Sequence, residues 1–348
     1  MKTLRLTVDA ERLGSAEAQE ALECGALILR AGGLVAFPTE TVYGLGANAL
    51  DAAAVERIFA AKQRPAWDPV IVHISDSAML ESLVTEVPER ARKLMDAFWP
   101  GPLTLLLARS AAVPDAVTAG RPLVGVRMPA HPVALELIRR AGVPVAAPSA
   151  NRFGRTSPTT AAHVLEDLDG RIDAVVDAGA TGLGLESTVL DCGQSPMVIY
   201  RPGAVTATEI FEIAGAVEIY QGGDLTSEPR AALPSPGVGL RHYAPRARLV
   251  LVDASLAELG PKLAKAALNW PGERVGVMLP GGVAAPDSVA ASFKWGRWAA
   301  PEEMARTLYA GLRALDAEGC TVILCPLPPP EGIGAAMRDR LLKAGVRG

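Results

Sequence analysis

Polar side chains in this chain cluster directly after apolar, strand-like segments. The segment at residues 38–49 reads PTETVYGLGANA and offers the hydroxyls of Thr39 and Thr41 beside paired glycines. Further candidates occupy similar places, and they are Lys62, Arg64, Asp68, His73, Arg127, Ser149, Asn151, Ser157, Ser187 and Arg201. Lysine, arginine and hydroxyl groups at strand ends suit the binding of polyphosphates and carboxylates.

Each of these residues also has a purely structural interpretation. Lys62 and Arg64 end a predicted helix, where a cation offsets the helix dipole by only ~0.3–1 kcal/mol. His73 alone is better explained as a satisfied core histidine. Arg127 is different, because it stands in the apolar segment VGVRMP. A buried arginine is costly unless it meets an anion.

Several common catalytic motifs are absent from the sequence. It contains no GxxxxGK[ST], HExxH, GxSxG or CxxC pattern. Gly182 and Gly184 form only part of a dinucleotide fingerprint, and a glycine-rich turn explains them better. The four cysteines are scattered, which favours neither a disulfide framework nor a zinc site.

Composition predicts a globular protein of two domains. The chain has 348 residues, of which 49% are hydrophobic and 21% charged. Its net charge of −4 argues against a protein that coats nucleic acid or anionic membranes. Acidic and basic residues interrupt the N-terminal segment, and no apolar run is long enough for a membrane span. We therefore expect a soluble cytoplasmic enzyme.

Hydrophobic periodicity predicts a first α/β or α+β domain at residues 1–215. Its predicted strands are residues 34–38, 69–75, 103–108, 123–128, 143–148, 174–177, 188–191 and 197–200. Helices are predicted at 16–31, which ends at a pair of glycines, and at 51–61, which Asp51 can cap.

A linker at 216–246 separates that domain from a second one at 247–348. The central part of the linker, from 221 to 246, is dense in glycine and proline, and its hydrophobic residues follow neither the helical nor the strand period. After it, strands are predicted at 248–252, 275–279 and 321–324, with helices at 255–268, 301–318 and 334–344. This alternation predicts a small parallel α/β domain.

The ordered motifs PTETVYGLGANA, KQRP, VRMP, PSAN, SPT, ESTV and RPG resemble the Sua5/YrdC/YciO family. The later SPGVGLRHYAP makes the chain similar to the longer Sua5-type members. The resemblance implies a YrdC-like twisted sheet enclosing a basic cavity, followed by a smaller Rossmann-like parallel domain. It also implies an L-threonylcarbamoyladenylate synthase, a nucleotidyltransferase that makes threonylcarbamoyl-AMP and pyrophosphate for N6-threonylcarbamoyladenosine synthesis at tRNA position 37.

Site residues follow from the same motifs. By resemblance, the L-threonine pocket comprises Thr41, His73, Arg127, Ala147 and Ser187. The ATP contacts are Arg64, Asp68, Leu123, Ser149, Ser157, Arg201 and Tyr243. The reaction centre comprises Lys62, Arg64, Ser149 and Asn151. Asp68 departs from the family, which commonly has Asn there.

The implied substrates are ATP, L-threonine and bicarbonate. Mg²⁺ is expected to arrive on the ATP phosphates, with no certain protein ligand and no organic cofactor. The product would pass to a tRNA threonylcarbamoyl transferase complex. Arg127 can hold the threonine carboxylate; the carboxylate newly formed on the amine then attacks the α-phosphorus of ATP, and pyrophosphate leaves. Such chemistry asks for positioning and charge neutralisation rather than a protein nucleophile.

Two other functions stay open at this stage. The first is an RNA-binding module, although the net charge and the lack of interleaved aromatic and basic residues speak against it. The second is a carbamoyltransferase with another acceptor, which would carry further regions not visible here. We also expect residues 235–237 and 242–245 of the linker to fold over the nucleotide cavity as a lid.

Overall fold

The computed structural model describes residues 2–221, 235 and 242–347. It divides into two compact units. The first comprises residues 1–153, 158–182 and 186–240, and the second comprises 154–157, 183–185 and 241–348. Two short segments from within the predicted first domain, 154–157 and 183–185, thus belong to the second unit.

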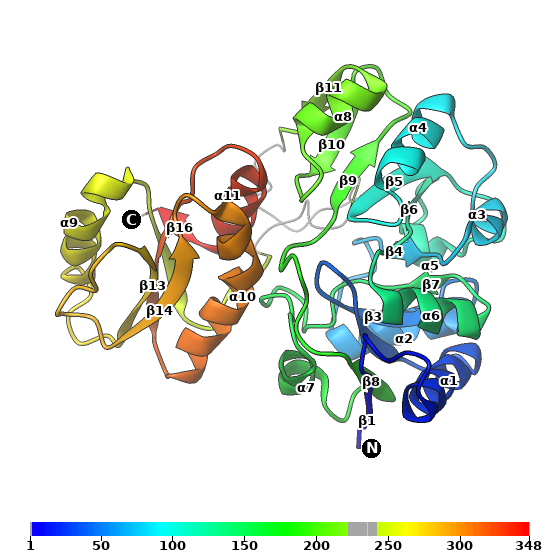
Figure 1. The fold of residues 1–348 in the computed structure, drawn as a ribbon, viewed down its shortest axis with the longest axis horizontal. Helices are drawn as coiled ribbons and strands as arrows, with labels where there is room; N and C mark the ends of the chain where they lie inside the picture. The colour runs from blue at the N-terminus through cyan, green and yellow to red at the C-terminus, as the bar shows by residue number, and fades with distance from the viewer. Residues whose placement is uncertain (1, 222–234, 236–241, 348) are drawn as a thin grey trace. The chain divides into compact units, whose positions relative to one another are not determined.

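An eleven-stranded mixed sheet forms the centre of the first unit (Figure 1). Across the sheet the strands are β1 (Leu4–Thr7), β8 (Ala174–Asp177), β2 (Val35–Pro38), β3 (Tyr43–Asn48), β7 (Val145–Ala146), β4 (Ile71–His73), β6 (Leu123–Arg127), β5 (Leu103–Ala108), β9 (Thr188–Asp191), β10 (Met197–Arg201) and β11 (Val217–Ile219). The sheet contains both parallel and antiparallel pairs; β4 and β6 are parallel, whereas β7 is antiparallel to both of its neighbours. The predicted large α/β sheet is confirmed.

Side chains of β2 alternate between two cores, as the twofold period of a strand requires. Leu34, just before the strand, and Ala36 face one core, while Val35 and Phe37 face the other. Helices α1 (Ala16–Arg30) and α6 (Pro132–Ala141) cover the Val35 side. The opposite side is covered by α2 (Ala52–Lys62), α3 (Ser77–Leu83), α4 (Glu89–Phe98), α5 (Asp115–Thr118), α7 (Ala161–Leu168) and α8 (Ala207–Ala214).

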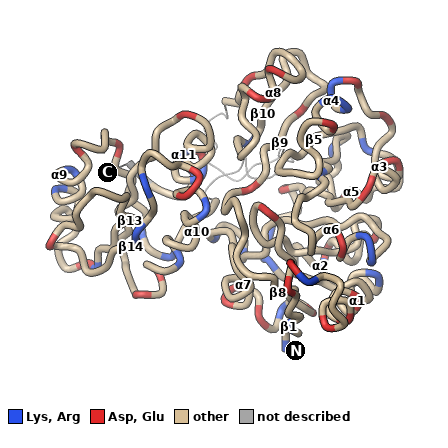
Figure 2. Tube along the Cα trace, in the orientation of Figure 1, with Lys and Arg blue, Asp and Glu red and all other residues tan. Residues whose placement is uncertain are grey.

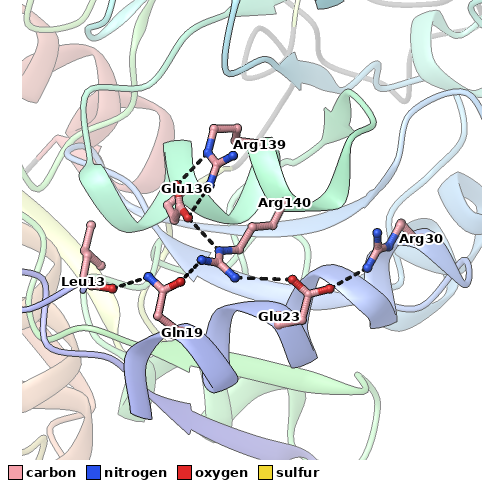
Figure 3. Close-up of polar contacts among 7 residues, drawn as sticks. All are labelled: Leu13, Gln19, Glu23, Arg30, Glu136, Arg139 and Arg140. Carbon is pink, nitrogen blue, oxygen red and sulfur yellow. Dashed lines mark hydrogen bonds and ion pairs between the residues drawn. The ribbon is translucent and has the colours of Figure 1, made fainter. Parts of the chain in front are cut away.

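A polar network joins α1 to α6 beside their apolar contact (Figure 3). Arg140 of α6 donates to Glu136 on its own helix at 2.7 Å, and to Gln19 and Glu23 of α1. Gln19 in turn donates to the carbonyl of Leu13 at 2.6 Å. Because Arg140 is largely buried, its several partners fix the two helices against each other.

The C-terminal end of helix α2 positions two site residues. The Asp51 side chain caps its first turn by accepting from the amides of Ala53 and Ala54. At the other end Gln63 adopts a left-handed conformation with φ of 55°, which stops the helix. Lys62 therefore lies on the last turn, and Arg64 begins the following loop.

The second unit contains a five-stranded parallel sheet, as predicted (Figure 1). Its strands in order are β14 (Ala291–Arg297), β13 (Val275–Gly281), β15 (Val322–Pro326), β12 (Arg248–Val252) and β16 (Val346–Arg347). Its helices are α9 (Leu256–Ala267), α10 (Pro301–Ala317) and α11 (Ile333–Ala344). Alternate residues such as Val250 and Val252 pack against Leu259 and Leu263 of α9.

Five strands were not predicted, and they are β1, β3, β11, β14 and β16. Strand β3 is the instructive case, because the sequence predicts only a polar segment at these residues. These residues, which include two glycines, form a strand that pairs antiparallel with β2. A Cβ at Gly46 would lie 2.8 Å from both Phe37 and Val145, so close packing against the neighbouring strands requires glycine there.

Charged residues of both signs are interspersed along the helices and loops of each unit (Figure 2). Among the described residues, no helix is long and apolar enough to cross a bilayer.

Gly203 follows β10 and lies against the backbone that leads into β9. A Cβ there would lie 2.6 Å from the carbonyl carbon of Ser187 and 2.8 Å from the oxygen of Glu186. We expect Gly203→Ala to lower the free energy of unfolding by about 1–3 kcal/mol, because backbone atoms cannot move aside cheaply. Urea denaturation followed by circular dichroism measures this change. Gly14→Ala, where a Cβ meets nothing within 4 Å, is the control; equal stability of the two variants would contradict the prediction.

Candidate active site

Three adjacent strands bring the predicted threonine-pocket residues together. His73 at the end of β4 is the register partner of Arg127 at the end of β6 and of Val145 on β7. Residues paired in register project to the same face of a sheet. Just after β7, the amide of Ala147 donates to the carbonyl of Ile71 at 2.8 Å. The ends of β4, β6 and β7 therefore form one wall.

Arg127 is a buried cation with three protein partners. Its Nε donates to the carbonyl of Gly101 at 3.1 Å, and a terminal nitrogen donates to the Thr41 hydroxyl at 3.0 Å. Its other terminal nitrogen lies 2.5 Å from a carboxylate oxygen of Glu40. Only 4% of the Arg127 side chain is exposed, so these partners hold the guanidinium in one orientation.

The Thr41 hydroxyl is oriented by its neighbours. Thr39 donates to the carbonyl of Val42 at 2.7 Å, so its own oxygen is left to accept. Thr41, 2.7 Å away, donates to that oxygen and accepts from Arg127. The turn between β2 and β3 thus presents a hydroxyl of fixed direction beside the arginine.

His73 is held in its neutral form. Burial, and after it the positive charge of Arg127, lower the pKa of the imidazole to about 3. Phe37 meets the ring edge-on at a centroid distance of 6.3 Å. The Nδ1 atom is buried without a hydrogen-bond partner of good geometry in the described part of the chain. A neutral imidazole beside a buried arginine can exchange a hydrogen bond with an uncharged ligand hydroxyl.

Ser187 lies between a strand hydroxyl and a second buried arginine. Its Oγ is 2.8 Å from the Thr104 Oγ1, and it accepts a hydrogen bond from Arg201 at 3.0 Å. The Nε of Arg201 donates to the Ser187 carbonyl at 3.0 Å. The same arginine therefore fixes both the backbone and the side chain of Ser187.

Lys62 ties the end of α2 to the segment that carries Ser149 and Asn151. Its ammonium donates to the carbonyls of both residues, and its own carbonyl accepts from the Phe153 amide at 2.9 Å. Burial lowers the pKa of Lys62 well below its usual value, and the neighbouring Arg64 lowers it further. Lys62 thus positions the Ser149–Asn151 turn as well as adding charge.

Asp68 is the counter-ion of Arg64. Their side chains lie 3.0 Å apart, and Arg64 also donates to the carbonyls of Asp68 at 3.1 Å and Pro69 at 2.6 Å. Asp68 is completely buried, and that burial raises its pKa, while Arg64, Lys62 and Arg201 oppose the rise. The acid is therefore directed at an arginine of the same loop.

Four cations belong to one region of the first unit, and they are Lys62, Arg64, Arg127 and Arg201. The charges of Arg127 and Arg201 both act on His73, and those of Lys62, Arg64 and Arg201 all act on Asp68. The structure thus brings together the predicted residues Thr41, Lys62, Arg64, Asp68, His73, Arg127, Ala147, Ser149, Asn151, Ser187 and Arg201. Such a concentration of positive charge favours anionic ligands.

The other predicted ATP contacts occupy different surroundings. Leu123 begins β6 and packs with Ile71, Leu106 and Val189. Ser157 is fully buried and belongs to the second unit.

Tyr243 also belongs to the second unit, where it stacks on Tyr309 at a centroid distance of 6.1 Å. The Arg340 guanidinium lies 5.2 Å from the centre of its ring. Residues 236 and 237 of the predicted lid lie outside the described residues.

Two site residues were missed by the sequence analysis. Glu40 stands within the quoted PTET motif, but nothing in its spacing connects it to Arg127. Thr104 is the one hydroxyl in the apolar strand β5, and a lone hydroxyl inside a strand is the signal that could have found it.

The depressed pKa of His73 predicts a specific pH dependence. Between its usual value of 6.5 and about 3, the unfolded chain binds a proton that the native imidazole does not. Stability should therefore fall as the pH falls through this window. His73→Gln should show a shallower fall, measured by urea denaturation from pH 4 to 7. An NMR titration of the four histidines should show a His73 signal unchanged from pH 5 to 8; a transition near pH 6.5 would contradict the prediction.

Comparison with known proteins covers both units. Residues 27–203 match a family model described as telomere recombination, for the Sua5, YciO and YrdC proteins. Residues 205–345 match the model for the C-terminal domain of threonylcarbamoyl-AMP synthase.

Similar proteins span almost the whole chain. A threonylcarbamoyl-AMP synthase of Pyrococcus abyssi is 45% identical over 318 residues, covering 91% of each chain. One of Bacillus subtilis is 44% identical, covering 99% of this chain and 98% of its own. The crystal structure of P. abyssi Sua5 complexed with L-threonine matches with a TM-score of 0.89 at 41% identity, over 99% of this chain and 100% of that one. On these grounds, and with the strand-end site in place, the chain belongs to the Sua5/YrdC family of threonylcarbamoyl-AMP synthases.

Proposed function

We propose that this chain makes threonylcarbamoyl-AMP, pyrophosphate and water from ATP, L-threonine and bicarbonate. The observation that carries the proposal is the buried Arg127, held beside the Thr41 hydroxyl and the neutral His73 within a region of four cations. One part of this arrangement suits a hydroxylated amino acid, and the rest suits a polyphosphate.

In the amino-acid part, Arg127 binds the threonine carboxylate. Its guanidinium has five donors, of which one donates to Gly101 and one to Thr41, while the second terminal nitrogen forms an ion pair with Glu40. His73 and Ser187 lie on the same strand-end region and are the groups that exchange hydrogen bonds with the threonine hydroxyl. Ala147 contributes through its backbone.

In the nucleotide part, Arg64 and Arg201 neutralise the phosphates, and Ser149 and Asn151 contribute polar contacts on the turn that Lys62 fixes. Leu123, Ser157 and Tyr243 complete the proposed ATP contacts by resemblance. Among the described residues, no group of three or more acidic, His or Cys side chains could hold a metal ion. We propose that Mg²⁺ enters as part of the substrate, carried by the ATP phosphates.

The reaction proceeds through two bond-forming steps. The threonine amine forms an N–C bond with bicarbonate carbon, and water leaves, which gives N-carboxythreonine. An oxygen of the new carboxylate then attacks the α-phosphorus of ATP, and the bond to the β,γ-diphosphate breaks to release pyrophosphate. Both steps combine anions, so the cations lower the barrier by offsetting charge repulsion and by positioning the reactants.

The product is a mixed anhydride, which fits an activated donor for a second enzyme. We propose that a tRNA threonylcarbamoyl transferase complex consumes it in the cytoplasm. The defining experiment incubates the pure protein with ATP, L-threonine and labelled bicarbonate, and follows pyrophosphate and the labelled adenylate. Pyrophosphate release that does not depend on threonine would reject the proposal.

Threonine specificity tests the amino-acid part. 2-Aminobutyrate lacks only the hydroxyl, so it should leave the buried His73 and Ser187 groups without their ligand partner. We expect its kcat/KM to be lower by at least about a hundredfold. Steady-state pyrophosphate release at saturating ATP measures the ratio. Equal efficiency of the two amino acids would show that these residues do not sense the hydroxyl.

The role of Arg64 can be separated from its support of Asp68. Arg64→Ala alone leaves a buried carboxylate without its counter-ion and should cost about 3–5 kcal/mol of stability. The double variant Arg64→Ala/Asp68→Asn removes both charges, so it should recover much of that stability while pyrophosphate release stays at least a hundredfold down, as is typical when one preorganised donor is lost.

Thermal denaturation and pyrophosphate release, measured on both variants, separate the two effects. Arg12→Ala, an exposed arginine of the same unit, is the control. Activity that returned together with stability in the double variant would make Arg64 a structural residue only.

A further inference from the structure

Glu40 is a carboxylate placed beside the buried Arg127 and without a role in the reaction as described so far. Its side chain is 15% exposed, and one oxygen lies 2.5 Å from a terminal nitrogen of Arg127. Both carboxylate oxygens are shielded from solvent, and neither makes a hydrogen bond of good geometry with a described residue. A carboxylate that is shielded from water and accepts no hydrogen bond can bind a further cation or hydrogen-bond donor.

The backbone around Glu40 holds that carboxylate in place. Thr39 Oγ1 accepts from the amides of Thr41 at 3.2 Å and Val42 at 3.3 Å, which closes a tight turn around residue 40. The strands on either side, β2 and β3, are paired directly up to Pro38 and Tyr43. Glu40 is therefore a fixed group of the pocket wall.

Charge balance connects Glu40 to an amino-acid substrate. An amino acid brings a carboxylate and an ammonium group that are separated by a single carbon atom. When the ligand carboxylate joins Arg127, two carboxylates surround one guanidinium, and their repulsion is relieved only by a further positive charge. The α-ammonium of the same ligand supplies that charge next to Glu40.

We propose that Glu40 is the residue that binds the α-ammonium group of L-threonine, so that Arg127 and Glu40 together recognise the zwitterion. The proposal rests on the proposed function, in which Arg127 binds the carboxylate. Asp68 is another acid that faces cations of this region, and it is directed at Arg64. Glu40 thereby holds the nitrogen near the position where it is carboxylated, once the ammonium group has lost one proton to solvent, and makes the pocket selective for amino acids over hydroxy acids.

A pair of ligands that differ only at the amine tests this assignment. Isothermal titration calorimetry on the full chain compares L-threonine with the 2,3-dihydroxybutanoate of matching configuration, in which a hydroxyl replaces the amine. In Glu40→Gln, the Kd of threonine should rise at least about tenfold, because a charge-assisted contact is lost. The Kd of the hydroxy acid should stay unchanged or fall. Glu20→Gln, on the exposed face of α1, is the matched control and should bind both ligands as the unaltered chain does.

Each other outcome has a distinct meaning. If Glu40→Gln bound threonine more tightly, Glu40 would be a competitor of the ligand carboxylate, and the proposal would be wrong. Equal weakening of both ligands would make Glu40 a support for Arg127 only, and it would equally overturn the proposal. An unaltered chain that binds the hydroxy acid but not threonine would reject the proposed function itself.

Folding is checked separately by thermal denaturation. If Glu40→Gln fails to fold, Glu40→Asp keeps the charge but shortens the side chain by one methylene. It should show a smaller, amine-specific loss of threonine affinity. Affinities for both ligands equal to those of the unaltered chain would then count against the proposal.

Discussion

The burial of Arg127 is the constraint on which the candidate site depends. A guanidinium inside a sheet is tolerated only when fixed partners satisfy it. Here those partners come from two places in the chain: the Gly101 carbonyl before β5, and the β2–β3 turn, which supplies the Thr41 hydroxyl and the Glu40 carboxylate. The register of β4 against β6 then places His73 beside the arginine. The sheet order and the β2–β3 turn together bring these partners to the arginine.

The positive charge of the site cations changes the pKa values of neighbouring groups. It helps to keep His73 neutral, and it adds to burial in lowering the pKa of Lys62. Asp68 offsets part of it, and burial raises the pKa of that acid. A site with this excess of buried cations is stabilised by anionic ligands, since they bind the native state and not the unfolded chain. The same charges that favour ATP and threonine thus make the ligand-free site electrostatically costly.

Local patterns predicted most helices and strands. Helices at 16–31 and 301–318 were found within one residue of α1 and α10, because capping residues and glycine signals lie next to the elements they end. Strand β3 was missed because glycine lacks strand propensity, and only close packing against Phe37 and Val145 explains its presence there. The segments 154–157 and 183–185 could not be assigned to the second unit either, since that depends on contacts with distant parts of the chain.

By itself the sequence determined the α/β class, the parallel second sheet, the family, and the identity of the strand-end cations and hydroxyls. It did so because element periodicity and motif order are local properties. Only the tertiary structure decided which of these groups are partners. Thr41 and Arg127 are 86 residues apart, and Thr104 and Ser187 are 83 apart. Glu40 became the counter-ion of Arg127. Those pairings depend on strand register and on the direction of each buried side chain, and no spacing along the chain encodes either.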